Sequence, residues 1–103
     1  MTTIEARIIV DNYLIKEAKA ISKASQVYLN KQYIDEYMSL IPLNDNSDCS
    51  INDSGDSFEI ILKVDCIFKK QAKKRGRGAY CYLPLEYADK KILIFKSPTF
   101  ELL

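Results

Sequence analysis

The sequence predicts a small, mainly β protein: a barrel made of two tandem, pseudo-symmetric repeats with short helical turns. Three observations indicate this fold class. Apolar and polar residues alternate in several short runs, as they do in strands with one buried face. These runs are separated by glycine, proline, asparagine and aspartate, which favour turns. Residues 4–43 also align with residues 58–96 at a constant spacing of 54 positions.

The alignment of the two segments needs no gap, and their apolar positions agree as well. A repeat of about forty residues is too short to be stable alone. We therefore expect the two repeats to complete one core within a single domain, residues 1–103. The identical pairs are Glu5 and Glu59, Val10 and Val64, Asp11 and Asp65, Lys16 and Lys70, Ala18 and Ala72, Lys19 and Lys73, Tyr28 and Tyr82, Leu29 and Leu83, Tyr33 and Tyr87, and Asp35 and Asp89.

The first repeat is predicted as strand, loop, strand, helical turn and strand. Its first segment alternates apolar and charged residues, as a half-buried strand does. The loop contains helix-forming residues, but its counterpart contains Gly76 and Gly78, which would destabilise a helix. Asn30 can cap the helical turn, and Pro42 ends the last strand. The expected elements are residues 4–15, 16–25, 26–29, 30–37 and 38–43, in that order.

Residues 44–57 are predicted to be an acidic, flexible linker, because asparagine, aspartate, serine and glycine dominate them. The second repeat then follows the order of the first, and a short tail ends the chain. Its expected elements are a strand at 58–68, a basic loop at 69–78, a strand at 79–83, a turn or helix at 84–90, a strand at 91–96 and the tail at 97–103.

Composition excludes several classes of function. Hydrophobic residues make up 48% of the chain, yet no apolar run approaches the length of a membrane span. The first residues do not resemble a secretory signal, so we expect a cytoplasmic protein. There is no histidine, and the three cysteines form no C-x-x-C pair. Without a nucleophile–base pair or metal-ligand spacing, we expect no enzyme activity, no metal and no cofactor.

Charge is distributed unevenly along the chain. Residues 1–57 carry five basic and nine acidic side chains, and residues 58–103 carry ten basic and five acidic ones. The two parts therefore have formal charges of −4 and +5. Six of the nine residues from Lys69 to Arg77 are cationic. Such a loop is suited to a polyanion.

The segment GRGAYCYLPLEYADKKILIF, residues 76–95, resembles the swapped-hairpin domain of the AbrB/MazE type. It is most similar to the short AbrB-like proteins encoded by archaeal transposons and plasmids. The first repeat departs from the pattern: Ser22 and Ala24 replace the turn glycines, and Asn30 replaces the proline. Asp89 stands where the family usually has glycine. The matching residues are Gly76, Gly78, Tyr82, Leu83, Pro84, Glu86, Tyr87, Lys90 and Lys91.

This resemblance implies a barrel of two interlocked hairpins, which two fused repeats can form within one chain. It implies a transcriptional regulator that binds double-stranded DNA at the nucleoid, for a mobile element or plasmid. Arg75 and Arg77 are best suited to base edges. A homodimer would supply two basic loops and recognise a palindromic site. The expected DNA-binding residues are Lys69, Lys70, Lys73, Lys74, Arg75 and Arg77, with Lys16, Lys19 and Lys23 as weaker counterparts.

Two alternatives remain open from the sequence. One is a protein-interaction module, antitoxin-like or adaptor-like, although the chain has almost no tail for a toxin. The other is an RNA-binding protein that uses the same loop together with Tyr80. Most tyrosines recur in both repeats, as Tyr28 and Tyr82 do, so packing explains them better than base stacking. Tyr80 does not recur, because its counterpart is Gln26.

Overall fold

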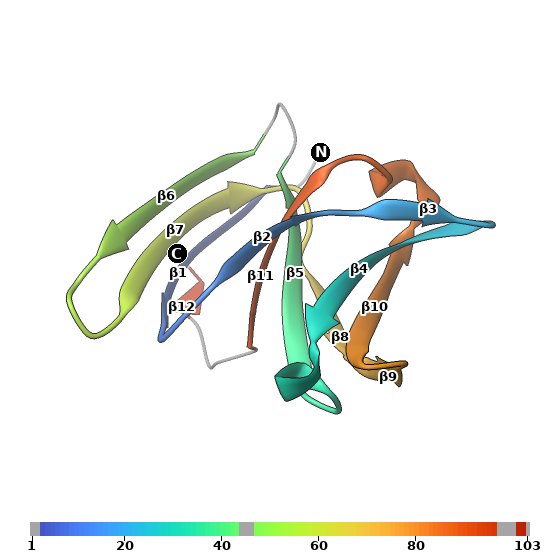
Figure 1. The fold of residues 1–103 in the computed structure, drawn as a ribbon. Coiled ribbons are helices and arrows are strands. Elements are labelled where there is room, and N and C mark those ends of the chain that lie inside the picture. Colours follow the sequence, from blue (N-terminus) through green and yellow to red (C-terminus); the bar gives the residue numbers. More distant parts are fainter. Residues whose placement is uncertain (1–2, 44–46, 97–100, 103) are drawn as a thin grey trace.

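The computed structural model of the 103-residue chain describes residues 3–43, 47–96 and 101–102. These residues form short strands and two 3-10 helices, so the mainly β class is confirmed. The strands make three four-stranded antiparallel sheets, and the central sheet lies between the other two (Figure 1). Each described sheet ends in edge strands and does not close on itself. The prediction of a closed barrel is therefore wrong.

The first sheet is antiparallel, and in it the first strands of the two aligned segments pair with each other. Ile8 pairs with Ile60, and both are buried, while Ile9 and Ile61 point outward. This alternation is the period-two pattern that the sequence predicted for the first strand of each repeat. The strands in spatial order are β12 (Glu101–Leu102), β1 (Ile4–Val10), β7 (Phe58–Val64) and β6 (Asp48–Asp53).

Strand β6 corrects the expectation that residues 44–57 are a flexible linker. All six of its residues pair with β7, from Asp48 opposite Lys63 to Asp53 opposite Phe58. The physical reason is that Cys49 and Ile51 alternate with polar residues and pack against the adjacent core. Two apolar side chains on one face are enough to hold a short strand when the edge of a neighbouring strand is available for pairing. Residues 44–46, and residues 97–100 and 103 of the predicted tail, lie outside the described residues.

The central sheet is buried on both faces. Its two inner strands, β11 and β5, are nearly continuous runs of apolar residues, as strands covered on both sides are. Leu40 and Ile92 face one core, whereas Ile41 and Leu93 face the other. The strands in spatial order are β2 (Leu14–Glu17), β11 (Lys91–Lys96), β5 (Tyr37–Leu43) and β8 (Phe68–Gln71).

The third sheet has one buried and one exposed face. Val27, Leu29, Ala79, Cys81 and Leu83 point into the core that this sheet shares with the central one. Its long inner strands pair over their full length. The strands in spatial order are β3 (Lys19–Ile21), β4 (Ala24–Asn30), β10 (Gly78–Pro84) and β9 (Lys73–Arg75).

The segments expected to be loops, residues 16–25 and 69–78, are largely strands. Each is split at a buried alanine, Ala18 or Ala72, where the chain passes from the central sheet to the third sheet. The amide of Ala72 donates to the carbonyl oxygen of Glu36 at 2.9 Å. Strands β2 and β8 pair with strands of the other half, whereas β3 and β9 pair with β4 and β10 in local hairpins. The helical turns are confirmed but shorter than expected: η1 (Lys31–Tyr33) and η2 (Leu85–Tyr87).

The elements of the first half, residues 4–43, recur 54 positions later in the second half, residues 58–96. Thus β1 to β5 and η1 correspond to β7 to β11 and η2 over the described residues. The pairs β1–β7, β4–β10 and β5–β11 all join the two halves. Neither half therefore makes a four-stranded sheet by itself.

Candidate nucleic-acid interface

The cations predicted in the second half gather on two short strands and one turn. Lys69 and Lys70 lie on β8, Lys73 to Arg75 form β9, and Arg77 lies in the turn before β10. The lysines and Arg77 are exposed, whereas Arg75 is partly buried. The structure therefore brings these predicted residues together on one edge of the molecule.

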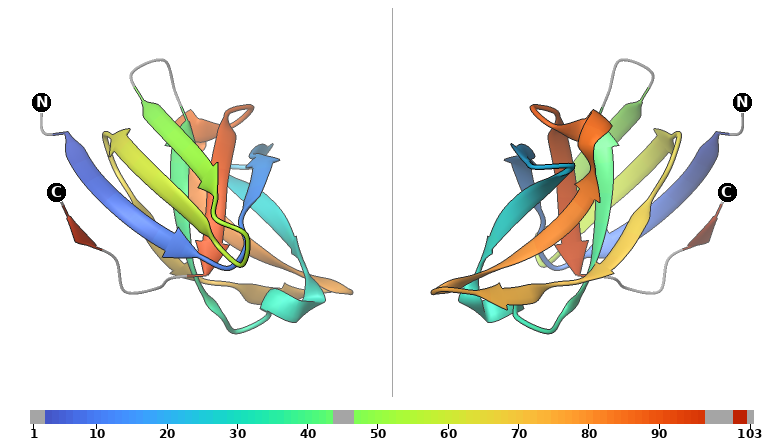
Figure 2. Two further views of the ribbon diagram at one scale, coloured as in Figure 1. Left: turned by 90° about the vertical axis from the view of Figure 1, so that its left-hand side faces the viewer. Right: turned by 90° about the vertical axis from the view of Figure 1, so that its right-hand side faces the viewer.

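The turn between β9 and β10 depends on glycine in two different ways. Gly76 has φ +59°, in the left-handed region that residues with a Cβ adopt at a cost. Gly78 instead lies against the neighbouring strand, where an added Cβ would be 2.8 Å from the carbonyl oxygen of Leu29. In both views of Figure 2 the tip of this hairpin projects beyond the rest of the third sheet. The hairpin is thus a two-stranded arm with cations at its end.

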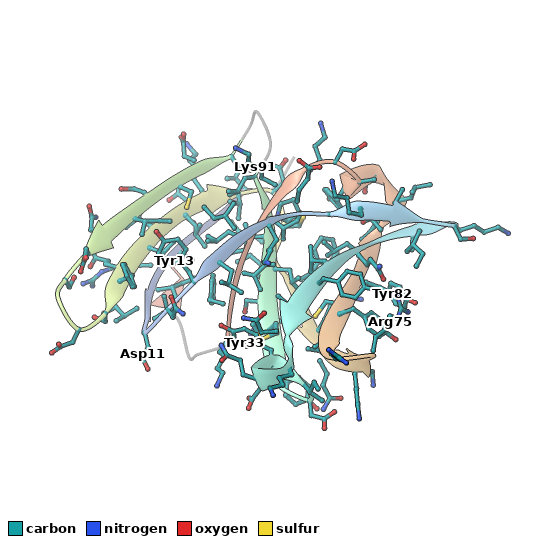
Figure 3. All side chains as sticks on the ribbon, in the orientation of Figure 1. Asp11, Tyr13, Tyr33, Arg75, Tyr82 and Lys91 are labelled. Carbon is teal, nitrogen blue, oxygen red and sulfur yellow. The ribbon has the colours of Figure 1, made fainter. Side chains whose placement is uncertain are left out.

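Arg75 is held on the outer face of the third sheet by three side chains. Its Nη1 donates to Gln26 Oε1, and its Nη2 donates to the Tyr82 hydroxyl, both at 2.7 Å. Its guanidinium carbon lies 3.9 Å from the centre of the Tyr80 ring. Figure 3 shows Arg75 next to Tyr82. The hydroxyls of Tyr28 and Tyr82 beside the guanidinium raise the pKa of Arg75. An Arg75 contact with a base edge would require these bonds to break, so Arg77 is the better candidate for that contact.

The tyrosines on this face are not packed in a core. Tyr28 is 50% exposed and Tyr82 is 42% exposed, so the packing interpretation of these two residues is wrong. It holds for Tyr33, which is buried. Tyr80 and Tyr82 make an edge-to-face pair with ring centres 4.8 Å apart. Sequence reasoning missed Gln26 and Tyr82 as partners of Arg75, because only the register of β4, β10 and β9 brings them together.

A shallow groove runs beside the tyrosines. Its volume is about 350 Å³, and Lys69, Lys70 and Lys73 line it together with Tyr80 and Tyr82. Burial raises the pKa of the Cys81 thiol at this groove to about 11, so the thiol is protonated at neutral pH. The groove therefore combines cations and aromatic rings without an ionised nucleophile.

We call the edge formed by β8, β9 and the turn before β10 the basic edge, and four of its cations have no carboxylate partner among the residues that the structure describes. Among the described residues, Lys70, Lys73, Lys74 and Arg77 form no ion pair. Exposed cations without an anionic partner keep their attraction for an external polyanion. This edge is therefore the strongest candidate surface for nucleic acid.

The predicted cations of the first half lie elsewhere. Lys16 is on β2, at the edge of the central sheet opposite β8. Lys19 on β3 and Lys23 in the turn that follows lie at the edge of the third sheet opposite β9. Lys19 Nζ donates to Glu17 Oε1 at 2.6 Å, which raises the pKa of Lys19 and lowers the pKa of Glu17. The structure does not bring this group together with the basic edge.

A larger hollow, of about 500 Å³, lies near the start of β2. Met38, Ile94, Phe95 and Tyr33 line its floor, and Asp11 lies at its rim (Figure 3). Its walls are mainly apolar, and its charged members are exposed. It lacks the cluster of cations that distinguishes the basic edge.

The chain matches no known protein-family model, and no curated protein or solved structure is significantly similar to it. Within the described residues, no helix is both long and apolar enough to cross a membrane. In that same part of the chain, no three His, Cys, Asp or Glu side chains lie close enough to hold a metal ion. The function proposed below therefore rests on the geometry of the basic edge.

Proposed function

We propose that the protein binds double-stranded DNA through the β9–β10 hairpin and the adjoining strand β8. The observation that carries this proposal is a projecting two-stranded arm with three exposed cations, Lys73, Lys74 and Arg77, that form no ion pair with any residue the structure describes. The major groove of DNA admits a two-stranded β-ribbon. Lysines on such a ribbon neutralise phosphates, and an arginine at its tip, Arg77, can bind a guanine edge through two parallel hydrogen bonds.

The architecture that we propose is a fused pair of swapped-hairpin units of the AbrB type, in which the first is the degenerate copy. Three features support it: the spacing of 54 positions between equivalent elements, the matching ladder registers and the pairing of strands across the halves. Asp35 and Asp89 also share a left-handed backbone, with φ 68° and 67°. The single chain then corresponds to the dimer of simpler relatives.

The biological role that follows is transcriptional regulation, in the cytoplasm at the nucleoid, of a mobile element or plasmid. One chain presents a single basic hairpin, so one chain covers half of a symmetric site. A homodimer on DNA supplies the second hairpin and recognises a palindromic site. Electrostatic docking of this kind makes affinity fall steeply with salt.

The test compares two triple variants that change net charge equally. The first is Lys73→Ala/Lys74→Ala/Arg77→Ala on the hairpin. The second is the control, Lys63→Ala/Lys90→Ala/Lys91→Ala, in which all three lysines are exposed away from the hairpin. Binding to a mixed-sequence duplex is measured by fluorescence anisotropy between about 50 and 200 mM salt.

The hairpin variant is expected to bind at least about tenfold more weakly, and its salt dependence should decrease by about one counterion for each lost phosphate contact. The control should bind within about twofold of the native protein, since its lysines contact no phosphate. Thermal melting confirms that both variants fold. Equal losses in the two variants, or no loss in the hairpin variant, would reject the proposed surface.

A further inference from the structure

We infer that the outer face of the third sheet binds unpaired nucleotides, so that the preferred ligand is a duplex with an adjoining single-stranded segment. This inference rests on the proposed function, because the hairpin holds the duplex beside this face. It concerns different residues, namely Gln26, Tyr28, Arg75, Tyr80 and Tyr82. We call this group the tyrosine face.

The strand register places these side chains on one surface. Tyr80 is opposite Tyr28 in the β4–β10 ladder, and Tyr82 is opposite Gln26. Residues directly opposite each other in an antiparallel pair point to the same side of the sheet. The neighbouring positions Ala79, Cys81 and Leu83 face the core instead. The tyrosine face is therefore a continuous outward surface across two long strands.

The rings on this surface are accessible and held in place. Tyr28 and Tyr82 are about half exposed, although tyrosine rings are usually covered when they serve packing. Arg75 is fixed in its orientation by Gln26 and by the Tyr82 hydroxyl. Unpaired bases stack on tyrosine rings and on arginine planes. A platform that is ordered before binding loses less entropy when a base stacks on it.

The charges beside the tyrosine face suit a nucleic-acid backbone. The groove that borders Tyr80 and Tyr82 is lined by Lys69, Lys70 and Lys73, and none of the described residues that line it is acidic. Phosphates in this groove would place their bases toward the rings. An acidic peptide would satisfy the lysines but would leave the exposed rings without a stacking partner. Bases within a duplex are already stacked on each other, so this face suits only unpaired ones.

The experiment measures three DNA probes by anisotropy: a blunt duplex of about thirty base pairs, the same duplex with an overhang of about six nucleotides, and the overhang strand alone. The variant Tyr28→Leu/Tyr82→Leu removes the exposed rings. The matched control Tyr28→Phe/Tyr82→Phe keeps the rings and, like the Leu variant, loses the hydroxyl that bonds Arg75. Thermal melting of both variants establishes that they fold.

The native protein should bind the overhang probe about tenfold more tightly than the blunt duplex. The Leu variant should lose this gain but keep its affinity for the blunt duplex, and the Phe variant should retain most of the gain. Equal binding of both probes by the native protein, or a gain that survives in the Leu variant, would overturn the inference. Competition by polyglutamate that depends on the same rings would overturn it as well.

Failure of the proposed function has a different signature. In that case the native protein does not bind the blunt duplex, and the Lys73→Ala/Lys74→Ala/Arg77→Ala variant behaves like its control. If the overhang strand alone still binds, and the Leu variant abolishes that binding, the tyrosine face remains a site for unpaired nucleotides. These results therefore distinguish duplex binding by the hairpin from binding of unpaired nucleotides by the tyrosine face.

Discussion

The hairpins β3–β4 and β9–β10 form the two edges of the same sheet, and they have the same backbone but different chemistry. Each turn begins with a left-handed residue, Ser22 with φ 54° and Gly76 with φ 59°. Each hairpin follows a buried alanine that bonds to the other half of the chain. The backbone conformation is therefore common to both edges, and it does not decide which edge is suited to DNA.

The chemical differences lie at outward positions. At four positions a cation or a neutral residue in the second half replaces an apolar or acidic residue in the first, and at a fifth a tyrosine replaces glutamine. The core positions keep their type, as Leu29 and Leu83 show. Outward positions can change charge at little cost to folding, so one edge can become basic while the fold persists. The substitutions from the first half to the second are Ile15 to Lys69, Glu17 to Gln71, Ala20 to Lys74, Ile21 to Arg75 and Gln26 to Tyr80.

The largest expected effect comes from giving β2 and β3 the charges of the equivalent strands β8 and β9. In the variant Ile15→Lys/Glu17→Gln/Ala20→Lys, two lysines are added and Lys19 loses the carboxylate that pairs with it. Affinity for a duplex should rise about tenfold at low salt, and the salt dependence should steepen by about two counterions. Anisotropy titrations over a salt series measure both quantities.

The control for this graft places the same charge change on the outer face of the first sheet, as Glu5→Gln/Ile9→Lys/Ser50→Lys. These residues are exposed and belong to β1 and β6. The control should change affinity by less than about twofold, because that face lies on the other side of the central sheet. A control that gains as much as the graft would show that overall charge, and not the hairpin, determines binding.

A smaller effect is expected from replacing Arg75 with the residue at the equivalent position, Arg75→Ile. The change removes two hydrogen bonds and the contact with Tyr80, and it leaves the Gln26 amide, only 6% exposed, with fewer partners. The melting temperature should fall by about 5 °C. Arg75→Lys should recover little of the lost melting temperature, since a lysine ammonium cannot reproduce the two hydrogen bonds that the planar guanidinium donates.

The reciprocal change, Ile21→Arg, tests whether the hydrogen bonds and the ring contact of Arg75 form only at the β9 edge of the sheet. Gln26 takes the place of Tyr80 there, so the new arginine lacks the ring over which the Arg75 guanidinium lies. The melting temperature should change by less than about 2 °C. A stabilisation comparable to the loss in Arg75→Ile would contradict the difference that we draw between the edges.

Sequence reasoning predicted the strands whose burial has a regular period. In β1 and β7 one face is covered, so polar and apolar residues alternate and the pattern is visible. Strand β6 was missed because its side chains are mostly aspartate, asparagine and serine, and its partner β7 supplies the ladder. Strands β2 and β8 were missed beyond their first residues, because their side chains are mostly exposed and show no alternation of buried and exposed positions.

The candidate site was predictable to the extent that its residues are neighbours in sequence. Lys69 to Arg77 stand out as a run of cations, and the structure keeps them together. The partners of Arg75 were not predictable in this way. Gln26 is 49 positions away, and its contact with Arg75 follows from the register between strands of the two halves. A side chain that looks free in a basic run can therefore be fixed by a distant residue.

The smallest effect concerns the two turns themselves, in the exchanges Ser22→Gly and Gly76→Ser. Both positions have a left-handed backbone and are exposed, so the exchange changes backbone strain without removing a core contact. Ser22→Gly should stabilise the protein by about 0.5 kcal/mol, and Gly76→Ser should destabilise it by a similar amount. Urea unfolding measures both, and the double variant should return to the native value because the sites are independent. If both single variants lose stability, the turns are not conformationally equivalent, and the difference between the edges extends to the backbone.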